Sequence, residues 1–326
     1  MIKPVRKGAS IVPSEAESSK PVAISAVTSG LLASFLLGWA PILGKFAYRA
    51  RVDPLTLASL RTLVAAIFLW CVHLVFWRRR VALGWRPALS CIIVGAINGV
   101  GSLFYYSGLN RLDASRAALL GSMVPLWVVL FLSASGQRMG IPTFVQLGIA
   151  LCGAMLVTSP WHAEDPADFL GSMLMFASAA INGWYIVSGQ WVLADIPSQS
   201  GTLYIMSGMA MTVIIARFLG GGIVLHGIPL EGWQAILALG LTTALSRMAM
   251  FFSLARLGGV QTAILNLFEL MVSLGLAFVF LGDRLAWYQW LGGALLLGGG
   301  LLAQRRTESA SDSWATFDPM PSSAGR

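Results

Sequence analysis

Residues 54–77 read PLTLASLRTLVAAIFLWCVHLVFW and are followed directly by Arg78, Arg79 and Arg80. The stretch contains one charged side chain, Arg61. At about 1.5 Å per residue, a helix of this length crosses about 30 Å of hydrocarbon. The arginines after it are typical of the cytoplasmic end of such a helix, because basic residues are retained on the inner side of a membrane. The stretch therefore predicts a transmembrane helix.

The same pattern recurs along the whole chain. Of its 326 residues 56% are hydrophobic and 11% are charged, against about 25% charged in an ordinary soluble domain. Apolar runs separated by short polar turns indicate an all-α integral membrane protein with ten transmembrane helices. We expect the helices at residues 22–47, 54–77, 87–109, 114–135, 141–160, 168–190, 199–219, 232–255, 259–281 and 286–304.

The basic residues gather at the ends of these spans. In a soluble protein a formal charge of +8 would suggest nucleic acid as a partner, but this placement is explained by the positive-inside effect. We therefore expect no nucleic-acid partner. The bias predicts that both termini face the cytoplasm, with residues 1–21 and 305–326 as cytoplasmic tails, the second of them disordered. The expected location is the inner (cytoplasmic) membrane.

Comparing the chain with itself at an offset of 145 residues reveals an internal repeat. The pair Gly38-Trp39 matches Gly183-Trp184, and Arg111-Leu112 matches Arg256-Leu257 in the same register. Residues 22–160 are therefore predicted to repeat as residues 168–304, with five spans in each copy. Because five is odd, the second copy enters the membrane from the opposite face. Such an inverted repeat is typical of carriers that work by alternating access around a midplane site.

Four sequence features, taken together, resemble a known family. They are Pro54-Leu-Thr-Leu-Ala-Ser-Leu-Arg61, Pro125 in the fourth span, Gly282-Asp283-Arg284-Leu285, and Gln289-Trp290-Leu291-Gly292-Gly293. Their order and spacing resemble the EamA-type members of the drug/metabolite transporter superfamily. The chain departs from that family in reading Glu269-Leu270 where Glu-Pro is common, and Gly282-Asp283-Arg284 where Gly-Glu-Arg is usual.

The resemblance implies a central cavity between spans 1–4 and 6–9, with spans 5 and 10 at the periphery. It also implies that the substrates are amino acids or other small metabolites. Both exporters and importers occur in the family.

Three ionisable side chains are expected deep in the membrane: Arg61, Arg247 and Glu269. Such groups are costly unless paired or hydrated, so each is a candidate for substrate binding. Arg61 or Arg247 would receive a substrate carboxylate, and Glu269 would be a counter-ion or a protonatable group that couples transport to a proton gradient. Two alternatives remain open: Arg247 and Glu269 form an ion pair that only fixes helix packing, and Arg61 is satisfied by backbone carbonyls.

Aromatic and amide side chains complete the candidate substrate site. Aromatic rings would line an apolar cavity, and amides would hydrogen-bond the substrate. A core or membrane-interface position for the rings and interhelical hydrogen bonding for the amides are open alternatives. These candidates are Trp39, Trp184, Tyr185, Tyr105, Tyr106, Asn98 and Asn182.

No motif indicates catalysis or a bound cofactor. Cys71, Cys91 and Cys152 show no metal-ligand spacing, and the sequence has no HExxH, GxSxG or Walker motif. We therefore expect no catalytic residue, no metal site and no cofactor, and a glycine-rich tenth span that offers a possible homodimer contact. The sequence favours a secondary transporter that exports a carboxylated or zwitterionic metabolite such as an amino acid. A metabolite or vitamin importer of the same fold, a membrane-embedded transferase and a channel are the alternatives.

Overall fold

The computed structural model of the protein describes residues 15–78, 82–135, 166–193, 196–221 and 227–295, with isolated residues between 145 and 156 and at 298. All regular structure in these ranges is helical, and residues 287–295 form a further helix that carries no label. The elements are α1 (Glu15–Gly38), α2 (Ala40–Arg49), α3 (Pro54–Phe76), α4 (Trp85–Arg111), α5 (Ala114–Gly121), α6 (Val124–Ala134), α8 (Pro166–Val192), α9 (Ser198–Leu219), α10 (Leu230–Leu276) and the π-helix η2 (Ala277–Leu281).

Seven stretches in the described residues are long and apolar enough to cross a membrane. They are Ser25–Arg49, Pro54–Phe76, Trp85–Arg111, Ala114–Ala134, Phe169–Val192, Ser198–Leu219 and Leu230–Leu257. A shorter apolar helix, Phe268–Leu281, lies where the ninth span is predicted. Most of the predicted span 141–160, and residues 296–304 of the last one apart from residue 298, fall outside the described residues. The chain is thus a multi-pass membrane protein, and ten spans remains a prediction.

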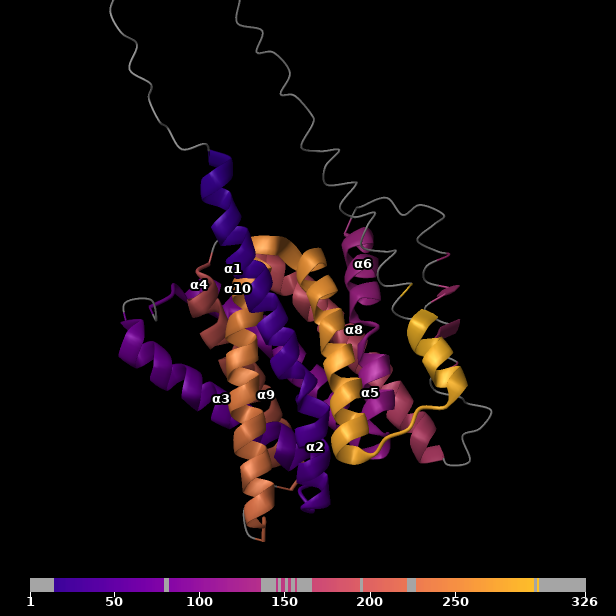
Figure 1. Ribbon diagram of the computed structural model, residues 1–326. Helices are drawn as coiled ribbons and strands as arrows, with labels where there is room; N and C mark the ends of the chain where they lie inside the picture. Colours follow the sequence, from indigo (N-terminus) through magenta and orange to yellow (C-terminus); the bar gives the residue numbers. More distant parts are fainter. Residues whose placement is uncertain are drawn as a thin grey trace, which may run out of the picture.

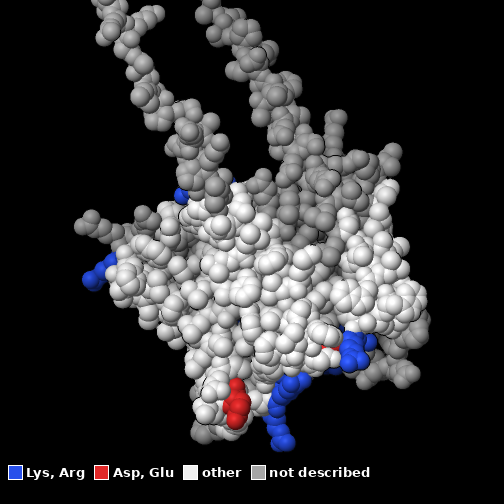
Figure 2. All heavy atoms as spheres, viewed as in Figure 1, with Lys and Arg blue, Asp and Glu red and all other residues white. Residues whose placement is uncertain are grey.

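Helix α10 is a single helical element that covers the predicted span 232–255 and most of the predicted span 259–281. Its 47 residues would extend about 70 Å if straight, more than twice the thickness of a bilayer core. Instead it ascends the bundle, turns over sharply and descends (Figure 1). The described centre of the visible face is white, and the blue and red residues lie toward its periphery (Figure 2). That distribution suits a protein whose middle is surrounded by lipid.

Proline interrupts two of the spanning stretches. α1 gives way to α2 at Trp39, beside Pro41, and α5 gives way to α6 at Ser122 and Met123, just before Pro125. A proline has no N–H, so the carbonyl four residues earlier loses its helical partner and the helix breaks. Both breaks lie within the bundle, where neighbouring helices surround them.

Glycine brings α4 and α9 into close contact. A side chain at Gly95 would meet the backbone carbonyl of Ile205, and one at Gly208 would meet the carbonyl of Ile92. The contact is therefore reciprocal, with one glycine from each helix. Such approach of two backbones is typical of small-residue packing in membranes.

Helices α3 and α9 run antiparallel and are joined by polar contacts along their length. At one end Asp53, which caps α3, pairs with Arg217 at 3.7 Å. At the other end Nε2 of His73 lies 3.0 Å from the carbonyl oxygen of Gln199. Between them the Ser59 hydroxyl donates to the Val213 carbonyl, and the Trp70 indole N–H donates to the Ser207 hydroxyl. These contacts hold α3 and α9 together over about five turns.

One helix contact occurs twice, at the offset found in the sequence. A side chain at Gly38 in α1 would meet Val272 in α10, and one at Gly183 in α8 would meet Trp127 in α6. Both partners shift by 145 residues from one contact to the other. The two halves therefore share this packing detail as well as their sequence pattern.

The first testable consequence concerns the α4–α9 contact. Gly95→Ala should destabilise the protein by about 1–3 kcal/mol, since its Cβ meets backbone atoms that cannot move aside locally. Gly275→Ala in α10, where the added Cβ meets nothing within 4 Å, is the matched control and should be neutral or stabilising. Thermal unfolding in detergent measures both, and equal melting temperatures would contradict the close contact.

Candidate functional site

Seven of the ten candidate residues line a single cavity in the bundle: Arg61, Asn98, Tyr105, Tyr106, Asn182, Arg247 and Glu269. They come from α3, α4, α8 and α10, so helices from both halves of the chain build the site. We call this cavity the arginine chamber. The space open to the centre of a water-sized sphere is about 100 Å³, which is room for several waters or a small polar group.

Arg61 is a buried cation held by neutral partners. Its Nη1 donates to the Thr243 hydroxyl on α10 at 3.0 Å, and its Nη2 donates to the Ser102 hydroxyl on α4. The guanidinium also lies over the Tyr106 ring, 4.5 Å from its centroid, a favourable cation–π geometry. Its Nε has no hydrogen-bond partner in the described part of the chain. Arg61 therefore ties three helices together but retains an unpaired charge.

Arg247 has fewer partners. Its Nη1 lies 3.5 Å from the sulfur of Met250, a weak acceptor, and its Nε has no partner among the described residues. The guanidinium lies over the Tyr185 ring at 5.2 Å from the centroid. Within the residues that the structure describes, Arg247 and Glu269 line the same chamber without forming an ion pair. The direct pairing considered from the sequence is therefore not seen, and Arg247 is the better placed of the two arginines to bind an anion.

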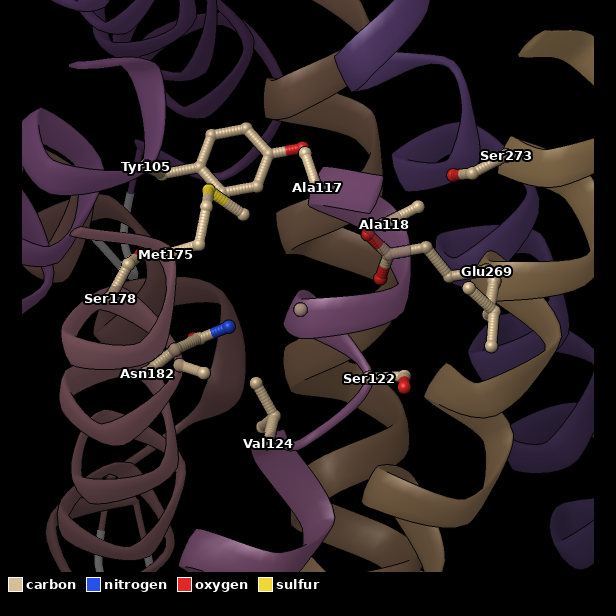
Figure 3. A pocket seen from close by; sticks show the side chains of 13 residues that line it. Tyr105, Ala117, Ala118, Ser122, Val124, Met175, Ser178, Asn182, Glu269 and Ser273 are labelled. Carbon is tan, nitrogen blue, oxygen red and sulfur yellow. The ribbon is translucent and has the colours of Figure 1, made fainter. Parts of the chain in front are cut away.

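A second chamber adjoins the first. The two share Tyr105, Ser178, Asn182 and Glu269 as lining residues. Residues of α4, α5, α6, α8 and α10 enclose the second chamber, which we call the glutamate chamber. Figure 3 shows Glu269 reaching into it from α10 and Asn182 from the opposite side, with Tyr105 between them at one end.

The remaining aromatic candidates lie elsewhere. Trp39 packs on Phe280, and Trp184 packs on Phe131 and Trp191. Neither tryptophan lines either chamber in the described structure. Tyr185 is fully buried behind Arg247 and supports it from outside the chamber. Tyr185 is therefore a core residue, whereas Trp39 and Trp184 are half-buried and pack on the exposed rings of Phe280 and Trp191.

The hydroxyl partners of Arg61 were missed in the sequence, although the repeat could have pointed to them. Thr243 is the residue 145 positions after Asn98, and Ser102 lies 145 positions before Arg247. In the same way Met250 corresponds to Tyr105, and Leu37 to Asn182, and all four line the arginine chamber. Applying the offset to each candidate would have identified these positions.

The two arginines should respond differently to a lysine substitution. Arg61→Lys should lower stability by about 1–2 kcal/mol, because one ammonium cannot reproduce a planar fork that spans Thr243 and Ser102. Arg247→Lys should change stability little, since it loses only a sulfur contact and ring stacking. Unfolding midpoints in detergent provide the comparison. The assignment fails if Arg247→Lys is the more destabilised variant.

Comparison with known proteins agrees with this architecture. The EamA-like transporter family profile matches twice, at residues 24–159 and 169–304. An uncharacterized transporter, YcbK, from Bacillus subtilis is 22% identical over 261 residues, covering 76% of this chain and 82% of its own length. An uncharacterized transporter from Archaeoglobus fulgidus is 25% identical over 221 residues, covering 68% and 78%.

A solved crystal structure superposes with a TM-score of 0.62 at 20% identity, covering 87% of this chain and 99% of that one. At that identity the likeness concerns the fold alone. The family profile is more informative, because it recurs in both halves and accounts for most of the sequence. This chain, with its apolar helices and buried polar chambers, belongs to the EamA-like transporter family.

Proposed function

We propose that this transporter is a secondary carrier that exports small carboxylated metabolites, amino acids among them, across the inner membrane. The observation that carries the proposal is the charge of the arginine chamber. Arg61 and Arg247 together carry two positive charges, and Glu269 supplies one negative charge. No described acidic side chain lies within ion-pair distance of either arginine.

An unpaired positive charge in a low-dielectric bundle is costly unless an anion or water completes the site. A carboxylate suits this place, since a guanidinium offers it two parallel donors. Arg247 is the proposed ligand because its side chain is least satisfied by the protein, and Arg61 supplies a fixed positive field beside it. Asn98, Tyr105 and Ser178 add polar groups, while Leu37 and Ile186 provide apolar wall for the rest of the substrate.

The proposed mechanism is alternating access by two halves of inverted topology. The repeated Gly38–Val272 and Gly183–Trp127 contacts support related packing in the halves. The antiparallel course of α3 and α9, which are equivalent in the predicted repeat, supports inversion. Two similar halves can exchange conformations around a central site, so that the chamber opens to one face at a time. Saturable, countertransport-stimulated flux would distinguish such a carrier from a channel.

The substrate proposal is tested by flux in proteoliposomes. Wild type should carry amino acids and other carboxylates at least tenfold better than their amide or ester derivatives, since these lose the negative charge. Arg247→Gln should remove most of that preference, and each tenfold loss corresponds to about 1.4 kcal/mol.

The matched control is Arg256→Gln on the same helix, where the arginine is exposed and lies over Phe252. It should transport like wild type. Equal transport of acids and amides by wild type would rule out the carboxylate proposal. Equal loss in both variants would instead indicate an unspecific effect of charge on α10.

The proposed topology places both termini in the cytoplasm, because basic residues such as Arg78–Arg80 concentrate on that side. A reporter fused after Arg306 should be active only if the reporter functions in the cytoplasm. An alkaline phosphatase fusion at the same site, which requires export, should be inactive. Strong phosphatase activity would overturn the topology and the even number of spans.

A further inference from the structure

The glutamate chamber has a chemistry distinct from the arginine chamber beside it. Its lining includes one acidic side chain, Glu269, and no lysine or arginine among the described residues. Arg61 and Arg247 line only the arginine chamber. The space open to the centre of a water-sized sphere is about 80 Å³, enough for a small group with a few waters. The chamber is therefore small, and the only charged side chain in its described lining is Glu269, which it shares with the arginine chamber.

Two of its acceptors lack partners. The Oδ1 of Asn182 is buried and makes no hydrogen bond in the described structure. The Glu269 carboxylate likewise forms no hydrogen bond and no ion pair there, although it lies deep in the bundle. Figure 3 shows both side chains extending into the chamber from opposite walls, with the amide nitrogen of Asn182 pointing into the chamber and its Oδ1 turned away from it. A carboxylate that receives no hydrogen bond inside the bundle is costly, so Glu269 suits a ligand that donates hydrogen bonds or carries positive charge. A half-turn of the Asn182 amide would present its unpaired Oδ1 to the same ligand.

The break between α5 and α6 adds a third group of acceptors to the lining of the glutamate chamber. Gly121 and Ser122, which line the chamber, end α5. Pro125 has no N–H, so the Gly121 carbonyl lacks the donor that a continuous helix would provide. The carboxyl end of α5 also carries the negative end of the helix dipole. The Ser122 hydroxyl donates to the Leu119 carbonyl, so its own oxygen remains available as an acceptor.

We infer that the glutamate chamber is a binding site for a compact monovalent cation, held by Glu269, Asn182 and the carboxyl end of α5. The inference deepens the proposed function and rests on it, because a carboxylate in the arginine chamber would then lie next to a cation in the adjoining one. A primary ammonium of the transported molecule and a free inorganic cation both satisfy the same acceptors. Interrupted helices supply cation sites of this kind in membrane carriers.

The experiment measures thermal unfolding of the purified full-length protein at constant ionic strength. The cation probes are ethylammonium chloride and sodium chloride, each compared with choline chloride, whose quaternary ammonium is bulky and donates no N–H hydrogen bond. The anion probe is choline propionate, which adds no test cation, and L-alanine carries both groups. A ligand that binds the folded state raises the melting temperature according to its concentration and affinity.

The variant is Glu269→Gln, and the matched control is Glu231→Gln at the exposed start of the same helix. Wild type and Glu231→Gln should bind ethylammonium or sodium at least tenfold more tightly than Glu269→Gln does. A response to ethylammonium and to L-alanine above propionate assigns the site to the substrate's ammonium. A response to sodium alone assigns it to an inorganic cation.

The inference is overturned if neither cation stabilises wild type more than choline does, or if Glu269→Gln responds like wild type. If Glu269→Gln fails to fold, Asn182→Leu takes its place with the same expected loss. The proposed function is judged separately, by propionate binding that depends on Arg247. Propionate binding without a cation response leaves the carboxylate proposal standing, and the reverse result leaves only the cation site.

Discussion

The structure depends on the cost of placing a guanidinium inside a lipid-embedded bundle. Arg61 lies where water is scarce, so its charge must be accommodated by groups that the protein supplies. Hydroxyls from α4 and α10 and the ring of Tyr106 meet that need, and they place three helices around one point. Helix α10 can come this close to α3 because Gly240 lies against Val64 and the backbone carbonyl of Arg61. The polar centre and the small-residue packing therefore require each other.

Much of the site could be predicted from the sequence, because charges and amides are rare in apolar spans. Arg61, Arg247 and Glu269 stand out for that reason, and all three line the arginine chamber. The position of a residue along its helix could also be predicted from the sequence, but the direction in which its side chain points could not. Arg247 lies nine residues before Arg256 and Glu269 ten residues after Gly259, which predicts similar depths on neighbouring spans, yet the two form no ion pair in the described structure. Equal depth fixes one coordinate and leaves rotation about the helix axis undetermined.

The tryptophans show a second limit of predicting the site from the sequence. Trp39 and Trp184 were candidates for the wall of the cavity, and each stands beside a repeat-related glycine. The glycines indeed mark close helix contacts, but the rings pack into aromatic clusters outside both chambers. A large ring next to a glycine is equally compatible with a cavity and with a filled core, and only packing distinguishes them. The helix breaks at Trp39 and Ser122 were likewise not predicted. A proline predicts a kink, but it does not tell how the lining of an adjacent cavity changes.

The polar ties between α3 and α9 have a mechanical consequence. A slide of one helix along the other would break the Asp53–Arg217 pair, two hydroxyl contacts and the contact of His73 with Gln199 together. Rotation of the pair as one body leaves all of them intact. Arg61 lies on α3, so it would travel with α9 while Ser102 and Thr243 stay with α4 and α10. Such a motion would break the hydroxyl contacts of Arg61 and also the reciprocal Gly95–Ile205 and Gly208–Ile92 contacts between α4 and α9, so both sets of contacts hold the α3–α9 pair in its present position.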